Sequence, residues 1–237
     1  MSRWIIVTST IALIAFLTTI GWSGTSGTRE SRFGVYSHGF RIGDVTSTYS
    51  LSGDAASNTL KFSSTANIDA QFIVSSYTLE SHEEALVAKE GTLRYSRSSK
   101  ENGRSSHVEG LMDNNAFVVT VTESNARRVL NFPRDQYDYT TMECPELHLK
   151  KEGDKMSARL LDLETLEIVT RRYTWVRSEE VQVGSMKHDF MVIDFEDKNK
   201  KCRRWIKPDA LGAIIARQEG RGKFGSYSVR MVDYRSR

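Results

Sequence analysis

Proline, cysteine and long linkers are scarce in this 237-residue chain, and each scarcity excludes a class of protein. Three prolines are too few for a proline-rich linker between domains. Two cysteines are too few for a four-cysteine zinc cluster, and they form no CxxC redox motif. With 39% hydrophobic and 27% charged residues, the composition is that of a folded, soluble body and not of a disordered chain.

Charge is absent from the N-terminal segment after Arg3, from Trp4 to Thr28. An apolar run over Ile5–Ile20 is followed by small and polar residues that allow cleavage near Ser23 or Gly27. This order of a basic start, an apolar middle and a small-residue end is typical of a signal peptide. We therefore expect residues 1–28 to be a signal peptide or, alternatively, an uncleaved membrane anchor, since the run is long enough to span a bilayer.

The rest of the chain, residues 29–237, shows a hydrophobic period of two and many turn signals. Segments such as residues 33–42, 116–122, 168–177 and 187–196 alternate apolar and polar side chains. The pattern predicts one all-β, mostly antiparallel domain, folded as a single curved sheet or a partial barrel. Beyond the N-terminal signal helix we expect at most one or two short helices, with Ser81–Lys89 and Asp135–Met142 as candidates.

Cys144 and Cys202 lie 58 positions apart. In an exported protein two cysteines meet an oxidising compartment, so we expect a disulfide between them. Closing a loop of this length would contribute roughly 4 kcal/mol on the chain-entropy model. The alternative is a pair of buried thiols that pack as small apolar side chains.

Motifs that carry chemistry are incomplete in this sequence. The stretch Gly220–Gly225 matches GxGxxG, but it is followed by an alternating strand pattern and not by the helix that a dinucleotide site requires. We read it as a hairpin loop, in which Arg221 and Lys223 are candidates for contact with an anion. The five histidines form no HExxH motif, and no GxSxG elbow is present. We predict no catalytic residue, no metal ligand and no cofactor.

Aromatic residues recur along the strand pattern, and such residues either fill the core or line an apolar cavity. The candidates for ligand contact are Tyr36, Tyr95, Trp175 and Trp205. Basic residues gather at the C-terminal end, where residues 198–237 hold twelve Lys and Arg against three acids. This end is either an anion-attracting surface or the solvated side of amphipathic strands.

Two segments resemble uncharacterised families of exported bacterial β-domains. The opening motif Phe33-Gly34-Val35-Tyr36 followed by Gly39-Phe40-Arg41-Ile42-Gly43-Asp44 is similar to their first hairpin. The segment Arg204–Ile215, a Trp-containing strand that turns at Asp209 into a second apolar strand, is similar to their last hairpin. The resemblance implies a curved antiparallel sheet in the bacterial envelope, in the style of lipoprotein-carrier half-barrels, and it assigns no functional residue.

These observations predict a non-enzymatic binding or scaffold protein of the periplasm or cell envelope. Its ligand would be a lipid or another apolar molecule on the curved sheet, and its basic end would meet an anionic membrane surface or an envelope protein. The alternative is an assembly factor that acts through an exposed sheet edge. A glycan hydrolase that uses two carboxylates ranks last, and export disfavours a nucleic-acid partner.

Overall fold

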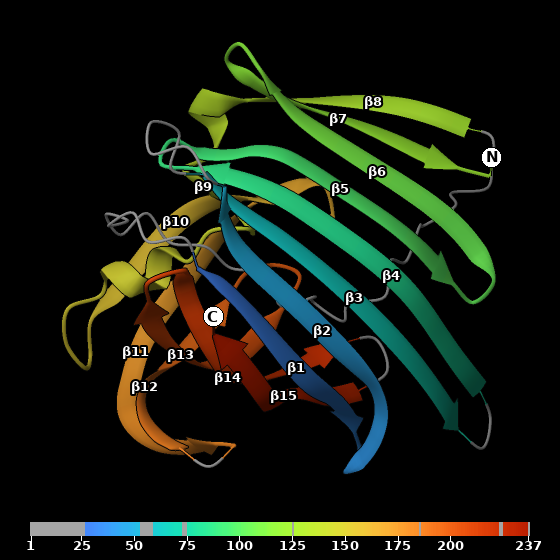
Figure 1. The fold of residues 1–237 in the computed structure, drawn as a ribbon. Helices are drawn as coiled ribbons and strands as arrows, with labels where there is room; N and C mark the ends of the chain where they lie inside the picture. The colour runs from blue at the N-terminus through green and yellow to red at the C-terminus, as the bar shows by residue number, and fades with distance from the viewer. Residues whose placement is uncertain are drawn as a thin grey trace.

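The computed structural model describes residues 27–52, 59–72, 75–124, 126–184, 186–222 and 225–236. These residues form one large, mostly antiparallel sheet that is strongly curved (Figure 1). The prediction of an all-β fold is therefore confirmed. Most of the predicted N-terminal segment, residues 1–26, lies outside the described residues. Within the described ranges, no helix is long and apolar enough to span a membrane.

Fifteen strands and two short 3-10 helices follow one another along the described residues. They are β1 (Thr28–Ser37), β2 (Phe40–Ser52), β3 (Thr59–Phe72), β4 (Ser75–Ala88), β5 (Gly91–Glu101), β6 (Arg104–Asp113), β7 (Ala116–Glu123), β8 (Ala126–Pro133), η1 (Arg134–Gln136), β9 (Tyr139–Thr140), η2 (Pro145–His148), β10 (Lys155–Asp162), β11 (Glu167–Val183), β12 (Met186–Glu196), β13 (Lys201–Asp209), β14 (Gly212–Gly222) and β15 (Gly225–Ser236).

The strand order is β8-β7-β6-β5-β4-β3-β2-β1-β15-β14-β13-β12-β11-β10-β9. Two meanders therefore run in opposite directions from a central pair, β1 with β15, whose register joins Arg29 to Ser236. The pairing of β9 with β10 is parallel, and the other described pairings are antiparallel.

The alternation of buried and exposed side chains identifies the strands, even where the local composition favours a helix. In β4 the side chains of Tyr77, Leu79, Ser81, Glu83, Ala85 and Val87 are buried, and the residues between them are mostly exposed. The helix considered over Ser81–Lys89 was wrong, because this segment belongs almost entirely to β4. Its period-two burial against the rest of the sheet outweighs the helix-forming composition of the segment.

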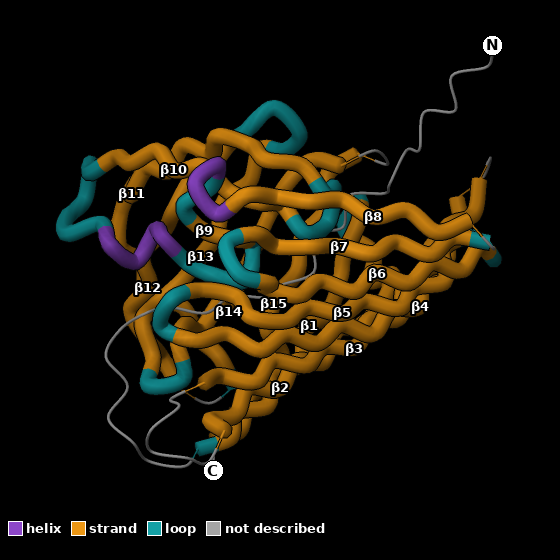
Figure 2. Tube along the Cα trace, turned by 90° about the horizontal axis from the view of Figure 1, so that it is seen from above, coloured by secondary structure: helices purple, strands orange, loops and turns teal. Residues whose placement is uncertain are grey.

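The sheet curves back over its own inner face, so strands of the same sheet cover that face. Figure 2 shows β2–β8 side by side, with β10–β13 gathered at the other end of the molecule. One core cluster joins residues of β1–β4, such as Phe33 and Ile68, to residues of β10–β15, such as Leu160 and Trp205. A second cluster joins β2–β7 to Leu161 and Leu163. The curvature thus brings the two meanders into contact through their apolar sides.

Glu143 connects one end of the sheet, β9, to the strand β5. Its Oε1 accepts hydrogen bonds from the backbone N–H of Thr92 (2.9 Å) and from the Thr92 hydroxyl (3.0 Å). Its Oε2 accepts one from the backbone N–H of Thr140 (3.0 Å). Burial raises the pKa of Glu143, although these hydrogen bonds act to lower it.

Ion pairs are buried within the second meander, β9–β15. Asp162 is fully buried and accepts hydrogen bonds from Arg171 (3.1 Å) and Lys200 (2.9 Å). Burial acts to raise the pKa of Asp162, but Lys200 and Arg171 outweigh it and lower that pKa. Arg204 donates to Glu146 at 2.5 Å and to Gln218 at 2.8 and 2.9 Å.

The basic C-terminal end is largely neutralised by the strands beside it. At least seven of its twelve cations form ion pairs within the described residues, namely Lys198, Lys200, Lys201, Arg203, Arg204, Arg217 and Arg235. Five of them pair with acids between Glu146 and Glu196. The charge asymmetry of the sequence therefore corresponds to adjacent acidic and basic strands, and it gives little support to a contact with an anionic surface.

Loss of the buried Arg204–Glu146 pair should destabilise the fold strongly. Arg204→Met leaves the Glu146 carboxylate buried, so we expect the free energy of unfolding to fall by about 3–5 kcal/mol. In the matched control, Arg172→Met breaks an exposed pair with Glu196 and should cost about 1 kcal/mol or less. Urea unfolding monitored by tryptophan fluorescence measures both, and equal effects would contradict a structural role for the buried pair.

Candidate binding surfaces

The four aromatic candidates do not lie together. Tyr95 belongs to the core cluster of β2–β7, whereas Trp205 and Trp175 belong to or pack against the other cluster. Tyr36 is half-buried, lies against Gly34 and has the guanidinium of Arg230 at 5.2 Å from its ring centroid. In these places Tyr95 and Trp205 act as core side chains, and a common ligand site built from all four has no geometric support.

Tyr95 makes a polar contact inside the core. Its hydroxyl donates a 2.6 Å hydrogen bond to Oε1 of Glu83, and both side chains are buried. Burial raises the pKa of Glu83 and raises that of Tyr95 well above its usual value. The hydroxyl of Tyr95 is therefore already hydrogen-bonded to a side chain of the neighbouring strand β4.

The expected disulfide does not form. Cys144 and Cys202 are both buried free thiols in the same core cluster. The Cys202 sulfur lies 3.5 Å from the hydroxyl of Tyr227. This outcome corresponds to the alternative in which the two cysteines pack as small apolar residues.

The GxGxxG stretch joins two antiparallel strands, as predicted for a hairpin. Gly220 and Gly222 end β14, and Gly225 begins β15. Arg221 is exposed in β14, opposite Ser226. Lys223, the other candidate for anion contact, lies outside the described residues. Among the residues that are described, no cluster of three His, Cys, Asp or Glu side chains is arranged to hold a metal.

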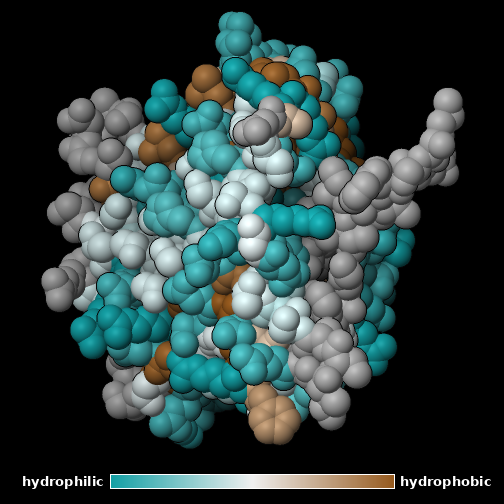
Figure 3. Space-filling model, turned by 90° about the vertical axis from the view of Figure 1, so that its right-hand side faces the viewer, coloured by the Kyte–Doolittle hydropathy of each residue, from teal (hydrophilic) through white to brown (hydrophobic). Residues whose placement is uncertain are grey.

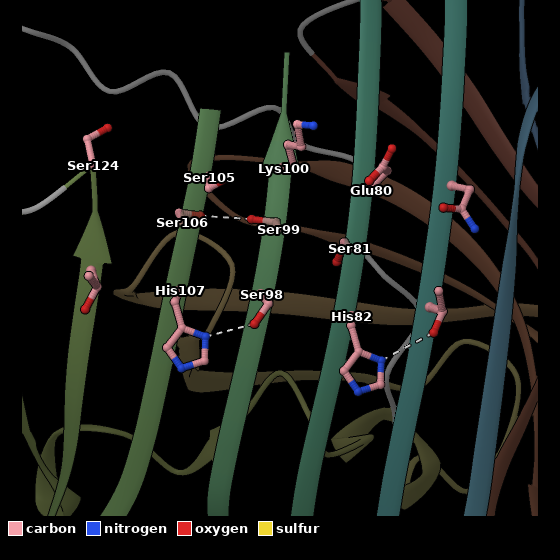
Figure 4. A pocket seen from close by; sticks show the side chains of 13 residues that line it. Glu80, Ser81, His82, Ser98, Ser99, Lys100, Ser105, Ser106, His107 and Ser124 are labelled. Carbon is pink, nitrogen blue, oxygen red and sulfur yellow. Dashed lines mark hydrogen bonds between the residues drawn. The ribbon is translucent and has the colours of Figure 1, made fainter. Parts of the chain in front are cut away.

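A hollow of about 810 Å³ lies on the outer face of β3–β7 (Figure 4). The strand registers align five outward side chains across these strands, Thr65, His82, Ser98, His107 and Thr122, which we call the histidine row. Glu80, Lys100, Asn67 and Ser105 line the hollow beside this row. Figure 4 shows both imidazole rings on the same side of the strands.

Each histidine of the row has a hydroxyl at one ring nitrogen and a glutamate carboxylate near the other. Nδ1 of His107 lies 2.9 Å from the hydroxyl of Ser98, and its Nε2 lies 3.2 Å from Oε1 of Glu109. For His82 the partners are Thr65 at 3.3 Å and Glu84 at 3.8 Å. The same unit of hydroxyl, histidine and glutamate thus occurs twice, once on β3–β4 and once on β5–β6.

A second hollow of about 720 Å³ adjoins the first on the same face, and we call the two together the trough. Its lining includes Glu84 and Glu109, the partners of the two histidines. Farther along the strands it includes the apolar side chains of Leu86, Leu111 and Val118. Leu111 is 46% exposed, which is unusual for a leucine in a strand.

Ser98, His107 and Glu109 lie in the order of a nucleophile, a base and an orienting acid, but the surroundings do not suit hydrolysis. Ser98 sits in the middle of β5, which is paired with β4 and β6 on both sides. Its neighbouring backbone N–H groups are therefore used by the sheet and cannot stabilise an oxyanion. Glu83 and Glu143, whose pKa values burial raises, are buried and already hydrogen-bonded.

The strand β8 forms one end of the sheet, and β7 is its single neighbour among the described strands. Two residues separate Glu123 from Ala126, so this hairpin closes with a hydrogen-bonded pair. Because bonded and non-bonded pairs alternate, the backbone groups of Arg127, Val129 and Asn131 point away from β7.

Most side chains of the edge strand β8 are exposed. Val129 is 59% exposed, and Arg127 and Arg128 are exposed beside it. Figure 3 shows a mostly hydrophilic side of the molecule with hydrophobic side chains gathered near its top, at the height where β6–β8 lie in Figure 1. The pairing of β7 with β8 is regular and contains no register shift. The edge thus lacks the bulge that often protects such a strand.

No protein-family model and no curated protein matches this sequence. The chain is similar in structure to a β-barrel-like protein of a domain of unknown function, DUF1849, from Brucella abortus. The TM-score is 0.59 at 10% sequence identity, over 94% of this chain and 99% of the other. At this identity the similarity concerns the fold alone, and it agrees with the expected resemblance to uncharacterised β-domains.

The trough was not predicted from the sequence, although a signal for it was present. His82-Glu83-Glu84 and His107-Val108-Glu109 are both His-x-Glu, and on a strand this spacing places the histidine and the glutamate on one face. That motif does not specify which strands are neighbours or in which register they pair.

The two thiols should resist modification in the folded protein. Burial raises the pKa of Cys202 and raises that of Cys144 well above its usual value, so little thiolate forms near neutral pH. We expect slow reaction with Ellman's reagent at about pH 8 and rapid reaction of both thiols after unfolding in guanidinium chloride. A native protein that is lighter by about 2 Da and yields no thiols on unfolding would contradict this.

Proposed function

We propose that this protein is a non-enzymatic binding or scaffold protein of the cell envelope that recruits an extended protein segment to the edge strand β8. The supporting observation is the edge itself, where the backbone groups of Arg127, Val129 and Asn131 face away from the sheet. An extended segment can add to such an edge as a further strand through main-chain hydrogen bonds. The N-terminal signal pattern supports a location outside the cytoplasm.

The charge of β8 favours an acidic partner. Arg127 and Arg128 are exposed on this strand. A second copy of the same edge would add the same positive charges, and like charges on adjacent strands are destabilising. A segment in which acidic residues alternate with apolar ones would place its acids on the face of Arg128 and its apolar side chains over Val129 on the opposite face.

Binding of a lipid or another apolar ligand on the inner face is a proposal with less support. Tyr95 and Trp205, two of the aromatic side chains expected to line that face, are buried in the two core clusters. A ligand at their positions would have to displace side chains that now form the core.

Removal of one outward N–H from β8 should abolish strand addition and leave the fold intact. Val129→Pro deletes an N–H that faces away from β7, at an exposed position where an edge strand tolerates proline. Val129→Thr, which keeps the N–H and the branched shape, is the matched control. We expect a synthetic peptide of alternating glutamate and valine to bind the parent protein and Val129→Thr, but not Val129→Pro.

Fluorescence anisotropy of the labelled peptide measures this binding, and a lysine–valine peptide tests the role of charge. Hydrogen exchange locates the contact. In the isolated protein the amides of Arg127, Val129 and Asn131 should exchange faster than those of Arg128 and Leu130, and the peptide should slow the first three. Equal binding by both variants, or protection elsewhere in the chain, would exclude β8 as the site.

A further inference from the structure

The trough on β3–β7 is independent of the β8 edge and has a different chemistry. Along β4 it runs from Glu80 to Leu86, about 20 Å at 3.4 Å per residue. It crosses five strands, which is about 19 Å at the usual strand spacing. A chain molecule of several units fits such a surface better than a single small metabolite does.

The unit of Ser98, His107 and Glu109 gives the trough a fixed hydrogen-bonding pattern. A carboxylate only accepts, so the ring nitrogen facing Glu109 carries the proton when His107 is neutral. The other nitrogen, Nδ1, then accepts the hydroxyl proton of Ser98. The lone pairs of the Ser98 oxygen remain available for a ligand donor, and Thr65 presents a second hydroxyl beside His82.

The charges of the first hollow balance each other. Glu80 and Lys100 carry the two opposite formal charges of its lining. The other lining side chains carry hydroxyl groups, an amide and the two imidazoles. A polyanion such as a nucleic acid would need an excess of cations, which this lining does not have. A surface of mixed donors and acceptors without excess charge suits a neutral ligand rich in hydroxyl groups.

The second hollow adds apolar side chains to this polar surface. Leu111 and Val118 are paired on the neighbouring strands β6 and β7, and Leu86 lies on β4, beyond Arg94 of β5 and next to Lys61 of β3 in the same cross-strand row. The partial exposure of Leu111 leaves apolar area that a ligand can cover. A ligand for the whole trough therefore carries hydroxyl groups along its length and small apolar substituents at intervals.

We propose that the trough binds a neutral, N-acetylated polysaccharide chain. The hydroxyl and amide groups of the sugar rings bond to Ser98, Thr65 and the carboxylates of Glu84 and Glu109. The acetyl methyl groups contact Leu111 and its apolar neighbours. The two histidine units, on the adjacent strand pairs β3–β4 and β5–β6, hold successive parts of the chain.

Tetra-N-acetylchitotetraose is a soluble probe for this proposal, and cellotetraose is its counterpart without acetyl groups. We expect isothermal titration calorimetry on the purified full chain to show binding of the acetylated sugar and weaker binding of cellotetraose. His82→Ala with His107→Ala should weaken binding by about tenfold, as expected for the loss of two modest hydrogen-bonding units. Leu111→Ser should weaken binding of the acetylated sugar and leave that of cellotetraose unchanged.

The matched control is Arg172→Ala with Glu196→Ala, an exposed pair on the outer face of β11 and β12. This variant should bind the acetylated sugar like the parent. All substituted side chains are at least partly exposed, so circular dichroism and thermal unfolding will show whether each variant is folded. Absence of binding to either sugar at millimolar concentration, or binding that survives loss of both histidines, would overturn the proposal.

Discussion

A single sheet has no second layer to bury its apolar side, and the structure depends on this constraint. The sheet bends until the inner faces of β1–β4 and β10–β15 share one core and those of β2–β7 share another with Leu161 and Leu163. The two ends, β8 and β9, then lie only a short segment apart in the chain. Glu143 joins the β9 end to β5 of the first meander with hydrogen bonds to Thr140 and Thr92.

The arrangement of charged side chains also follows from the bending of one sheet onto itself. Acids of η2, β10 and β12 neutralise cations in β13 and at Lys200 just before it. The pairs at Asp162 and Glu146 are buried, where an unpaired charge would be costly. The polar outer face of β3–β7 lies on the opposite side of the sheet from these pairs. Residues such as His82 and Ser98 on that face can therefore contact a ligand without disturbing the core.

The fold class could be predicted because period two is a local property of the chain. Alternation over residues 116–122 and 187–196 corresponds to β7 and β12. The error at Ser81–Lys89 arose where helix-forming residues alternate in burial, which only the neighbouring strands reveal. The disulfide prediction failed because spacing along the chain does not report the distance or orientation of two side chains.

The candidate surfaces were harder to predict, because they also depend on which distant residues the fold brings together. The histidine row joins residues from five strands, and its alignment depends on registers set by turns far from Thr65 or Thr122. The edge at β8 is visible only when the strand order is known. Conversely, Tyr95 and Trp205 were sound choices as aromatic residues on strands, but burial in the two cores gives them a structural role.

The pairing of β1 with β15 has a consequence for how the chain folds as it is made. The first strand of the domain is hydrogen-bonded to the last, with Arg29 opposite Ser236. Until the final residues emerge, β1 is an open edge next to β2, and the guanidinium of Arg29 lacks its partners Asp209 and the carbonyl of Ala213. The first meander can form early, but the sheet is complete only after the whole chain is present. Such long-range pairing is expected to make folding slow and to leave the early meander in need of protection from other chains.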